Sequence, residues 1–175
     1  MAETKTAFHS LLADLRKAGV MEDEYHWAGL VLGLLCRGYD PSDREISKLA
    51  SELLNGQSPL PGALVAKLTS MSFEFNENLS HASDELVPLP DQNEKAELRL
   101  KTLAELSYGL TLGLCCTPGN GMSYHLPQGS LTDFVDTLSE FVKVDTSGDL
   151  DEQDYNAILA YIREHLLEIY KKSKL

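Results

Sequence analysis

AGLVLGLLCRG, residues 28–38, is the stretch from which we predict the fold, because its pattern returns in YGLTLGLCCTPG, residues 108–119. The corresponding residues are Gly29 and Gly109, Gly33 and Gly113, and Cys36 and Cys116. Two glycines four residues apart lie on one side of a helix, and each costs about 1 kcal/mol relative to alanine in a helix interior. The usual gain that offsets this cost is a close approach of two helix backbones. The repeat therefore predicts two central Gly-x-x-x-Gly helices that cross near their glycines.

A second explanation of the glycines is that they make room for a ligand between the helices. The cysteines on the same surface are expected to be buried as small apolar side chains. Cys115 and Cys116 also fall at a helix C-terminus, where the negative end of the helix dipole disfavours a thiolate. We therefore expect close packing at the glycines and no cysteine nucleophile.

Apolar residues recur at helical spacing along nearly the whole chain, which predicts an all-α, single-domain bundle of about seven helices over residues 1–175. The expected helices lie at about 6–17, 22–37, 42–56, 60–81, 94–116, 130–142 and 152–172. The segment ELVPLP, residues 85–90, comes nearest to a strand, but its prolines argue against one. The longest break in the helical pattern is residues 117–129, with three glycines and two prolines.

Several helix boundaries carry sequence signals. Ser42 with Glu45 three residues later is a capping-box pattern. Ser130 is expected to cap the helix that follows the long break. Gly38 is suited to the left-handed position that ends many helices.

The chain is strongly acidic, with 15 lysines and arginines against 27 acids and a formal charge of −12. Such a chain repels phosphate backbones and anionic lipids, so we expect no direct nucleic acid binding and no membrane association. A protein with a basic surface is the expected partner, although the charge also serves solubility. A homodimer is a further expectation, because closed two-fold dimers are common.

The cysteine pattern indicates a reducing compartment, since the chain has three cysteines, two of them adjacent, and no disulfide framework. Residues 1–19 carry acids among their apolar residues, unlike a signal peptide. The longest uncharged apolar runs reach about half of the 20 residues that a membrane span needs. We therefore expect a cytoplasmic protein.

Common catalytic and metal motifs are absent from the sequence, which has no His-Glu-x-x-His, Cys-x-x-Cys, P-loop or Gly-x-Ser-x-Gly. Asp23 and Glu22 lie three and four residues before His26, a spacing that usually stabilises a helix. A di-iron bundle would instead need two Glu-x-x-His motifs. We predict no catalytic, cofactor-binding or metal-binding residue. The alternative is a metal-binding protein or enzyme whose site assembles from distant residues, around His26 or the loop at 117–129.

The acidic stretch DTSGDLDEQDY, residues 145–155, looks like a calcium loop at first. Counted from Asp145, however, the sixth residue is Leu150 instead of glycine and the twelfth is Asn156 instead of glutamate. A loop without these residues cannot wrap around the ion. We therefore predict no calcium site here.

The same stretch is better explained as a connection between two helices. Gly148 would end the first helix, and Asp149 or Asp151 would cap the second. Eight acids and one base, Lys143, lie between residues 130 and 154, which makes an acidic rim the candidate binding site for a basic partner. The rim residues are Asp145, Asp149, Asp151, Glu152 and Asp154.

Four segments appear in the order found in a known family. HWAGLVLGLLCRGYD, residues 26–40, is similar, with an offset of one residue, to a His-x-Gly-Leu-x-x-Gly-x-x-Cys-x-Gly helix of the YgfB/YecA-like family of small bacterial proteins. The matching residues are His26, Gly29, Leu30, Gly33, Cys36 and Gly38. PLPDQN at 88–93, LSYGLTLGL at 106–114 and YNAILAYIREHLLEIY at 155–170 resemble later segments of the family.

The resemblance implies an all-helical cytoplasmic bacterial protein of the YgfB branch. Longer YecA-type members carry a C-terminal Cys-rich metal motif, but no cysteine follows Cys116 here, so that zinc function does not carry over. The resemblance supplies no catalytic residue. We predict a non-enzymatic protein-interaction or regulatory module.

Overall fold

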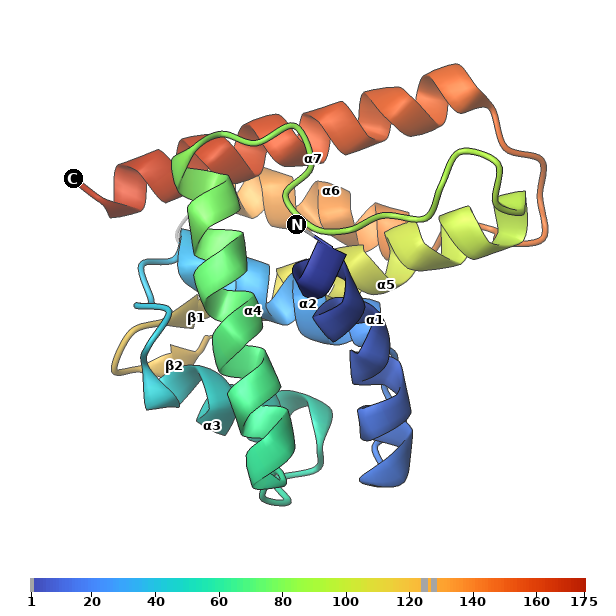
Figure 1. Cartoon of the computed structure of the whole chain (residues 1–175). Helices are drawn as coiled ribbons and strands as arrows, with labels where there is room; N and C mark the ends of the chain where they lie inside the picture. The colour runs from blue at the N-terminus through green and yellow to red at the C-terminus, as the bar shows by residue number, and fades with distance from the viewer. Residues whose placement is uncertain (1, 124–125, 127–128) are drawn as a thin grey trace.

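Two crossed helices, α2 (Glu24–Cys36) and α5 (Ala96–Leu114), form the centre of the molecule (Figure 1). The structure is a computed structural model that describes residues 2–123, 126 and 129–175, without the side chains of 2–7 and 9. The contact between α2 and α5 is more extensive than that between any other two elements in this part of the chain. Nearly every residue of α2 is buried, as expected of a helix that is apolar on all sides.

The glycines are the points at which α2 and α5 meet. A Cβ atom added to Gly109 would lie 2.2 Å from the carbonyl oxygen of His26, and one added to Gly29 would lie 2.4 Å from that of Leu106. A Cβ on Gly33 would lie 3.0 Å from the Cα of Gly113. All the nearest atoms belong to the backbone, so no flexible side chain could move aside. The predicted crossing is confirmed, and no ligand space separates the glycines.

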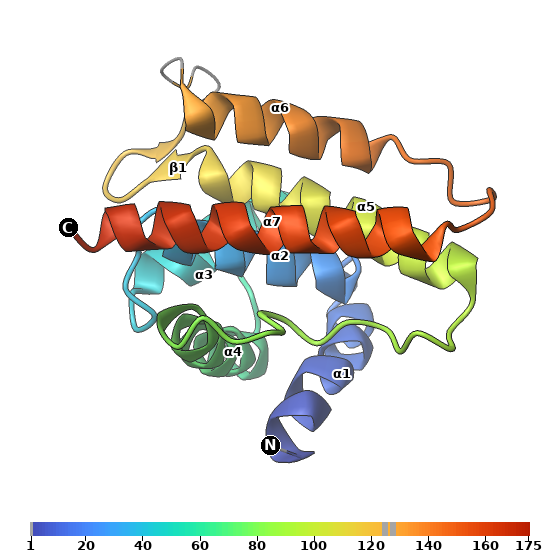
Figure 2. The ribbon, with the colours of Figure 1, turned by 90° about the horizontal axis from the view of Figure 1, so that it is seen from above.

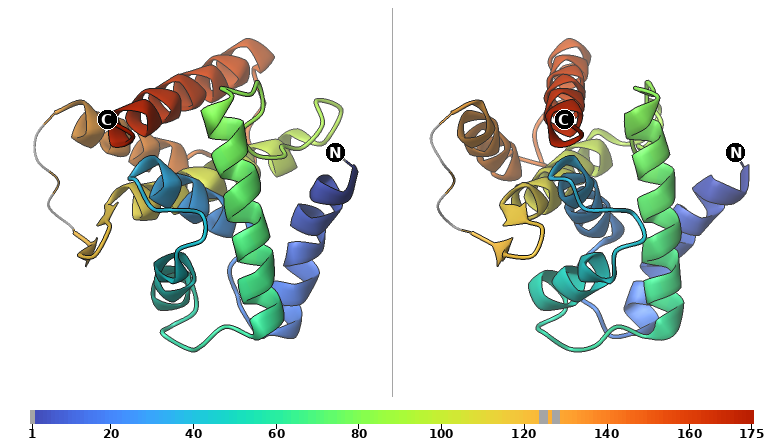
Figure 3. Two further views of the ribbon diagram at one scale, coloured as in Figure 1. Left: turned by 60° about the vertical axis from the view of Figure 1, so that its left-hand side comes forward. Right: turned by 90° about the vertical axis from the view of Figure 1, so that its left-hand side faces the viewer.

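Five further helices and a short ribbon surround the central pair within the described residues. They are α1 (Ala2–Lys17), α3 (Arg44–Leu54), α4 (Gly62–Ser80), β1 (Cys116–Thr117), β2 (Gly121–Met122), α6 (Ser130–Val142) and α7 (Glu152–Ser173). Helix α7 packs on α2 and α6 packs on α5, while α4 also contacts α2 and α1 (Figure 3). The predicted all-α bundle of about seven helices is confirmed.

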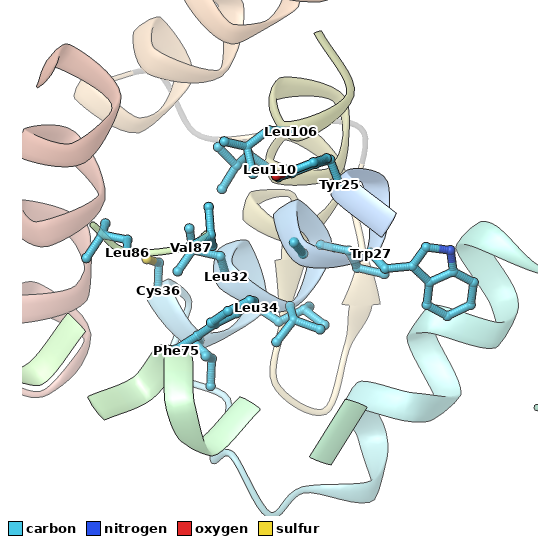
Figure 4. Close-up of a cluster of buried hydrophobic side chains, with 14 of the residues drawn as sticks. Tyr25, Trp27, Leu32, Leu34, Cys36, Phe75, Leu86, Val87, Leu106 and Leu110 are labelled. Atoms are coloured by element: carbon cyan, nitrogen blue, oxygen red, sulfur yellow. The ribbon is translucent and has the colours of Figure 1, made fainter. Parts of the chain in front are cut away.

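One continuous core joins these elements, and α2 supplies much of it. Figure 4 shows Leu32, Leu86 and Val87 on one side of α2 and Trp27 on the opposite side, beside α3. The indole of Trp27 is fully buried. Among the described residues, we find no helix with the length and apolar content that a membrane span requires.

Three expected helix boundaries were wrong. Asp43, not Ser42, caps α3, because Ser42 hydrogen-bonds Asp40 while the Asp43 side chain accepts from the backbone N–H of Glu45. Gly129, not Ser130, is the N-cap residue of α6, with a φ of 147° that suits glycine.

The third wrong boundary concerns Gly148, which does not end α6, because that helix stops at Val142. The side chain of Asp145 accepts from the N–H of Ser147 instead and forms a local turn. Gly38, in contrast, takes the expected left-handed conformation after α2, with a φ of 95°.

The ribbon of β1 and β2 was not predicted. Cys116 pairs with Met122 and Thr117 with Gly121 in an antiparallel register. Strands of two residues are too short to produce an alternating pattern, so only the glycines and proline of the turn are visible in the sequence.

The glycine contact yields a test of the central crossing. Gly109→Ala places a methyl group 2.2 Å from a backbone oxygen, so α5 must move away from α2. We expect a loss of about 1–3 kcal/mol or more in the free energy of unfolding, seen as a lower Tm in thermal denaturation. Gly33→Leu should destabilise for the same reason.

Gly62→Ala is the matched control, because Gly62 is helical and nothing lies within 4 Å of its added Cβ. We expect this variant to be as stable as the wild type or slightly more stable. Unchanged melting of both Gly109→Ala and Gly33→Leu would contradict the close backbone contact.

Candidate functional site

A furrow runs between α6 and α7, because their backbones rest mainly on different central helices and they meet through side chains. Figure 2 shows α7 in front of α2 and α6 along the edge of the molecule, with α5 visible between them. We call this feature the α6–α7 furrow. The end nearest the acidic connection is a pocket of about 390 Å³. Its lining residues are Thr137, Phe141, Asp154, Ala157, Ile158 and Tyr161.

Aromatic rings close the middle of the furrow. Phe134 of α6 stacks on His165 of α7, with 4.9 Å between ring centroids. Tyr161 lies 4.1 Å from His165 and makes an edge contact with Phe141 at 6.4 Å. Because Phe141 and Tyr161 are only partly buried, they offer aromatic surface to a molecule in the furrow.

The other end of the furrow is a pocket of about 290 Å³ with a different charge. Arg37, His165 and Lys172 line it together with Glu168. Lys172 forms an ion pair with Glu168 at 2.6 Å, and Arg37 donates to the carbonyl of Cys116 at 3.1 Å. The charge of Lys172 is therefore balanced by Glu168, whereas Arg37 keeps its positive charge because the oxygen to which it donates is neutral. The two ends of the furrow differ in the sign of their charge.

The predicted acidic rim lies at the connection between α6 and α7, but its members have different roles. The carboxylate of Asp145 accepts from the N–H and hydroxyl of Ser147, and these hydrogen bonds lower the pKa of Asp145. Asp151 caps α7 by accepting from the N–H of Asp154 at 3.0 Å, as expected. Both acids thus stabilise the turn and the helix start.

Glu152 is held by a buried arginine of α5. Its carboxylate forms a bidentate pair with Arg99, in which Nη2 donates to Oε2 at 2.9 Å. The hydrogen bond with Arg99 lowers the pKa of Glu152. The Arg99 guanidinium also lies over the ring of Tyr155, with its Cζ atom 4.5 Å from the ring centroid. This pair attaches the start of α7 to α5.

The buried position of Arg99 is indicated by the sequence, although it was not predicted. Arg99 lies at helical spacing with Leu103 and Leu106, both of which are buried. A charged residue on an apolar helix face needs a partner, and only 4% of Arg99 is exposed. The missing information was which of the many acids would reach it.

Asp149 and Asp154 are the rim acids most available to a partner. Both are exposed, and their carboxylates make no hydrogen bond or ion pair with any residue that the structure describes. Asp154 lines the acidic end of the furrow directly. The candidate site is therefore an apolar aromatic furrow with free carboxylates at one end.

A second group of charged residues surrounds His26, where an alternative site was considered. Lys101 lies 3.2 Å from Asp23 and 3.4 Å from Glu105. Burial and a hydrogen bond with Asp23 raise the pKa of Glu105 to about 7. Burial lowers the pKa of His26, whose Nδ1 accepts from the N–H of Asp23 at 3.2 Å.

The other alternative location, the loop at 117–129, falls partly outside the described residues, which omit 124, 125, 127 and 128. In the described part, the N–H of Gly119 donates to the carboxylate of Glu45. Across the residues whose positions are given, no three His, Cys, Asp or Glu side chains are arranged to hold a metal ion.

The three cysteines are buried and unpaired. The thiol of Cys36 faces the carbonyl of Leu166, and burial raises its pKa. Burial also raises the pKa of Cys115, and raises that of Cys116 to about 12. Thiols of this kind are weak nucleophiles at neutral pH.

Comparison with known proteins supports the fold alone. No family model and no curated protein matches the chain. The chain is similar to the crystal structure of the lpg0076 protein from Legionella pneumophila, with a TM-score of 0.68 and 21% sequence identity over 93% of each chain. The bundle architecture therefore occurs in a solved structure over nearly its whole length.

The ion pair between Arg99 and Glu152 predicts that neutralising two acids of the rim changes the free energy of unfolding by different amounts. Glu152→Gln should lower the free energy of unfolding, because it leaves the buried guanidinium without its carboxylate. Asp149→Asn removes the same charge from an acid without a partner, so its effect should stay within about 0.5 kcal/mol. Chemical denaturation measures both, and equal effects would show that the pair does not hold α7.

Glu105 predicts a dependence of stability on pH. Its pKa rises from 4.5 to about 7 on folding, so the fold prefers the protonated form. The stabilisation is complete below the unfolded pKa and is lost as the pH rises to about 7. Glu105→Gln should therefore gain stability relative to the wild type between these pH values. A difference that stays constant over this range, measured by denaturation, would contradict the raised pKa.

Proposed function

We propose that this chain is a cytoplasmic, non-enzymatic interaction module of the YgfB/YecA-like family, and that its α6–α7 furrow binds a basic segment of a partner protein. The observation that supports this most is the combination of aromatic surface and free carboxylates in one furrow. Phe141 and Tyr161 offer apolar contact, while the unpaired Asp154 lines the acidic end and the unpaired Asp149 belongs to the connection that leads into α7.

The dimensions of the acidic-end pocket suit one or two turns of a helix as the bound segment. The pocket extends along α7 from Asp154 to Tyr161, which corresponds to a length of about 11 Å, and the stacked rings of Phe134 and His165 close the furrow beyond it. An amphipathic helix can place its apolar face in a groove of this kind and its basic residues against the rim. The net charge of −12 would also speed the approach of such a partner.

The remaining parts of the proposal rest on general chemistry. Three unpaired thiols suit a reducing compartment such as the cytoplasm. The excess of acids disfavours nucleic acid as a partner. The order of the glycine helices supports the YgfB/YecA-like assignment, and a homodimer is proposed only because two-fold dimers are common.

The alternative of an enzyme is favoured by one observation, the pKa of about 7 at Glu105, which contacts Lys101 and Asp23 and would suit a general base. Lys101 and Asp23 occupy its carboxyl group, however, and the pocket at the acidic end of the furrow contains neither Glu105 nor His26. The interaction module is therefore the function that the geometry supports best.

The furrow can be tested with a helical peptide of leucine and lysine, using an otherwise identical peptide of leucine and glutamate as the charge control. We expect the basic peptide to bind and its Kd to rise with salt, because exposed charges are screened. Ala157→Arg should weaken binding at least about tenfold, since it adds a bulky cation to the pocket. Fluorescence anisotropy measures each affinity.

Ala66→Arg is the matched control variant, because Ala66 is an exposed alanine of α4. It should bind the basic peptide as the wild type does. Equal binding of both peptides, or an equal loss in Ala66→Arg and Ala157→Arg, would show that the furrow is not a site for basic segments.

A further inference from the structure

The end of the α6–α7 furrow that lies away from the acidic rim is a binding pocket of its own, with a volume of about 290 Å³. We call it the basic-end pocket. Its walls come from the end of α2, the start of α6 and the last turns of α7. It shares no lining residue with the acidic end, and the stacked rings of Phe134 and His165 close the furrow between the two.

Arg37 gives the basic-end pocket a positive charge that no neighbouring acid balances. Its Nε donates to the carbonyl of Cys116 at 3.1 Å and its Nη2 to the hydroxyl of Thr117 at 3.3 Å. Both acceptors are neutral, and no carboxylate in the described part of the chain pairs with this guanidinium. The two hydrogen bonds hold the guanidinium in one plane and leave Nη1 without an acceptor among the described residues. A fixed, planar guanidinium suits a carboxylate group.

Lys172 supplies a second cation to the same pocket. Its ammonium lies 2.6 Å from the carboxylate of Glu168, and both side chains are more than half exposed, at 61% and 58%. Ion pairs as exposed as this one contribute only about 0–1 kcal/mol, so the ammonium is free to turn to another carboxylate. An organic cation would find Glu168 already paired and would be repelled by Arg37. The charges of the pocket therefore select an anion.

The helix ends at the pocket do not reverse this selection. Helices α2 and α7 end there, and a helix C-terminus carries a partial negative charge. Their last carbonyls accept from backbone N–H groups, however, as Leu34 does from Tyr39 and Lys171 from Lys174, both at 3.2 Å. Ser130 at the start of α6 is exposed, and its hydroxyl has no partner in the part of the chain that the structure describes. It is one more donor for an anion.

The remaining wall of the pocket is apolar and accessible. Leu131 of α6 and Ile169 of α7 are only half-buried, and the thiol-bearing Cys36 lies beside them in the lining. Such a surface favours a hydrocarbon group over water. An apolar cavity of about 150 Å³ accommodates benzene, so a pocket of this volume has room for about six to eight carbon atoms.

We propose that the basic-end pocket binds a small organic carboxylate. Its carboxylate group lies at Arg37 and Lys172, and its hydrocarbon part lies against Leu131 and Ile169. The proposal does not depend on the binding of a basic protein segment, because that segment occupies the acidic end of the furrow.

Binding of hexanoate to the full chain, followed by NMR chemical shifts, tests the proposal. Hexanol, hexylamine and inorganic phosphate are the comparison probes, because they lack the charge, reverse it or lack the hydrocarbon part. We expect saturable binding of hexanoate and weaker binding of all three comparison probes.

Two variants of the exposed ion pair should change the affinity in opposite directions. Glu168→Gln frees the ammonium of Lys172 and should strengthen hexanoate binding about twofold to fivefold, whereas Lys172→Gln should weaken it by a similar factor. Each variant removes the same ion pair, so a purely structural role of the pair would not separate them. Arg37→Gln should weaken binding at least about tenfold, with its Tm measured alongside because Arg37 also holds the ribbon.

Two phenylalanine variants identify the pocket that is occupied. Ser130→Phe fills the basic-end pocket and should weaken hexanoate binding at least about tenfold. Ala157→Phe fills the acidic end instead and should leave hexanoate binding unchanged. The proposal is overturned by no saturable binding, by equal binding of any comparison probe, by changes of the same sign in Glu168→Gln and Lys172→Gln, or by equal effects of the two phenylalanine variants.

Discussion

The backbone contact between α2 and α5 is the constraint on which the rest of the structure depends. Because Gly29 and Gly109 bring the two helices together without side chains between them, the pair behaves as one rigid unit. The remaining surface of α2 must then be covered by other helices, since it is apolar on every side. Helices α1, α3, α4 and α7 provide that cover, and α6 covers α5.

The furrow beside α7 follows from this arrangement. The backbone of α7 rests mainly on α2 and meets α6 through aromatic side chains, so a furrow remains on one side, while residues 82–89, which join α4 to α5, pass along its other side. Aromatic rings fill the middle of the furrow, and hydrogen bonds from Arg163 and Tyr25 fix residues 82–89 in place. A helix that packs on one neighbour leaves two flanks, and here the flank toward α6 has an acidic end and a basic end.

The sequence predicted the features that repeat or that depend on local chemistry. The glycine pairs, the all-α bundle and the cap of α7 by Asp151 could be read from spacing alone. The cap of α3 could not be predicted from spacing, because Ser42 and Asp43 are both good N-cap residues. Ser42 hydrogen-bonds Asp40, so Asp43 caps the helix. The furrow also could not be predicted, since it depends on which helices pack together over long distances in the sequence.

The acidic connection illustrates the difference between charge and available charge. Its composition makes the local electrostatic potential negative, but the fold determines which carboxylates remain without a partner. Arg99 is buried on α5 and takes Glu152, while the start of α7 takes Asp151. Asp149 and Asp154 are left to face solvent. Three local partners, Arg99, the N–H of Ser147 and the start of α7, thus take three of the five rim acids into the structure, and of the two acids that remain Asp154 lines the pocket that also exposes Phe141 and Tyr161.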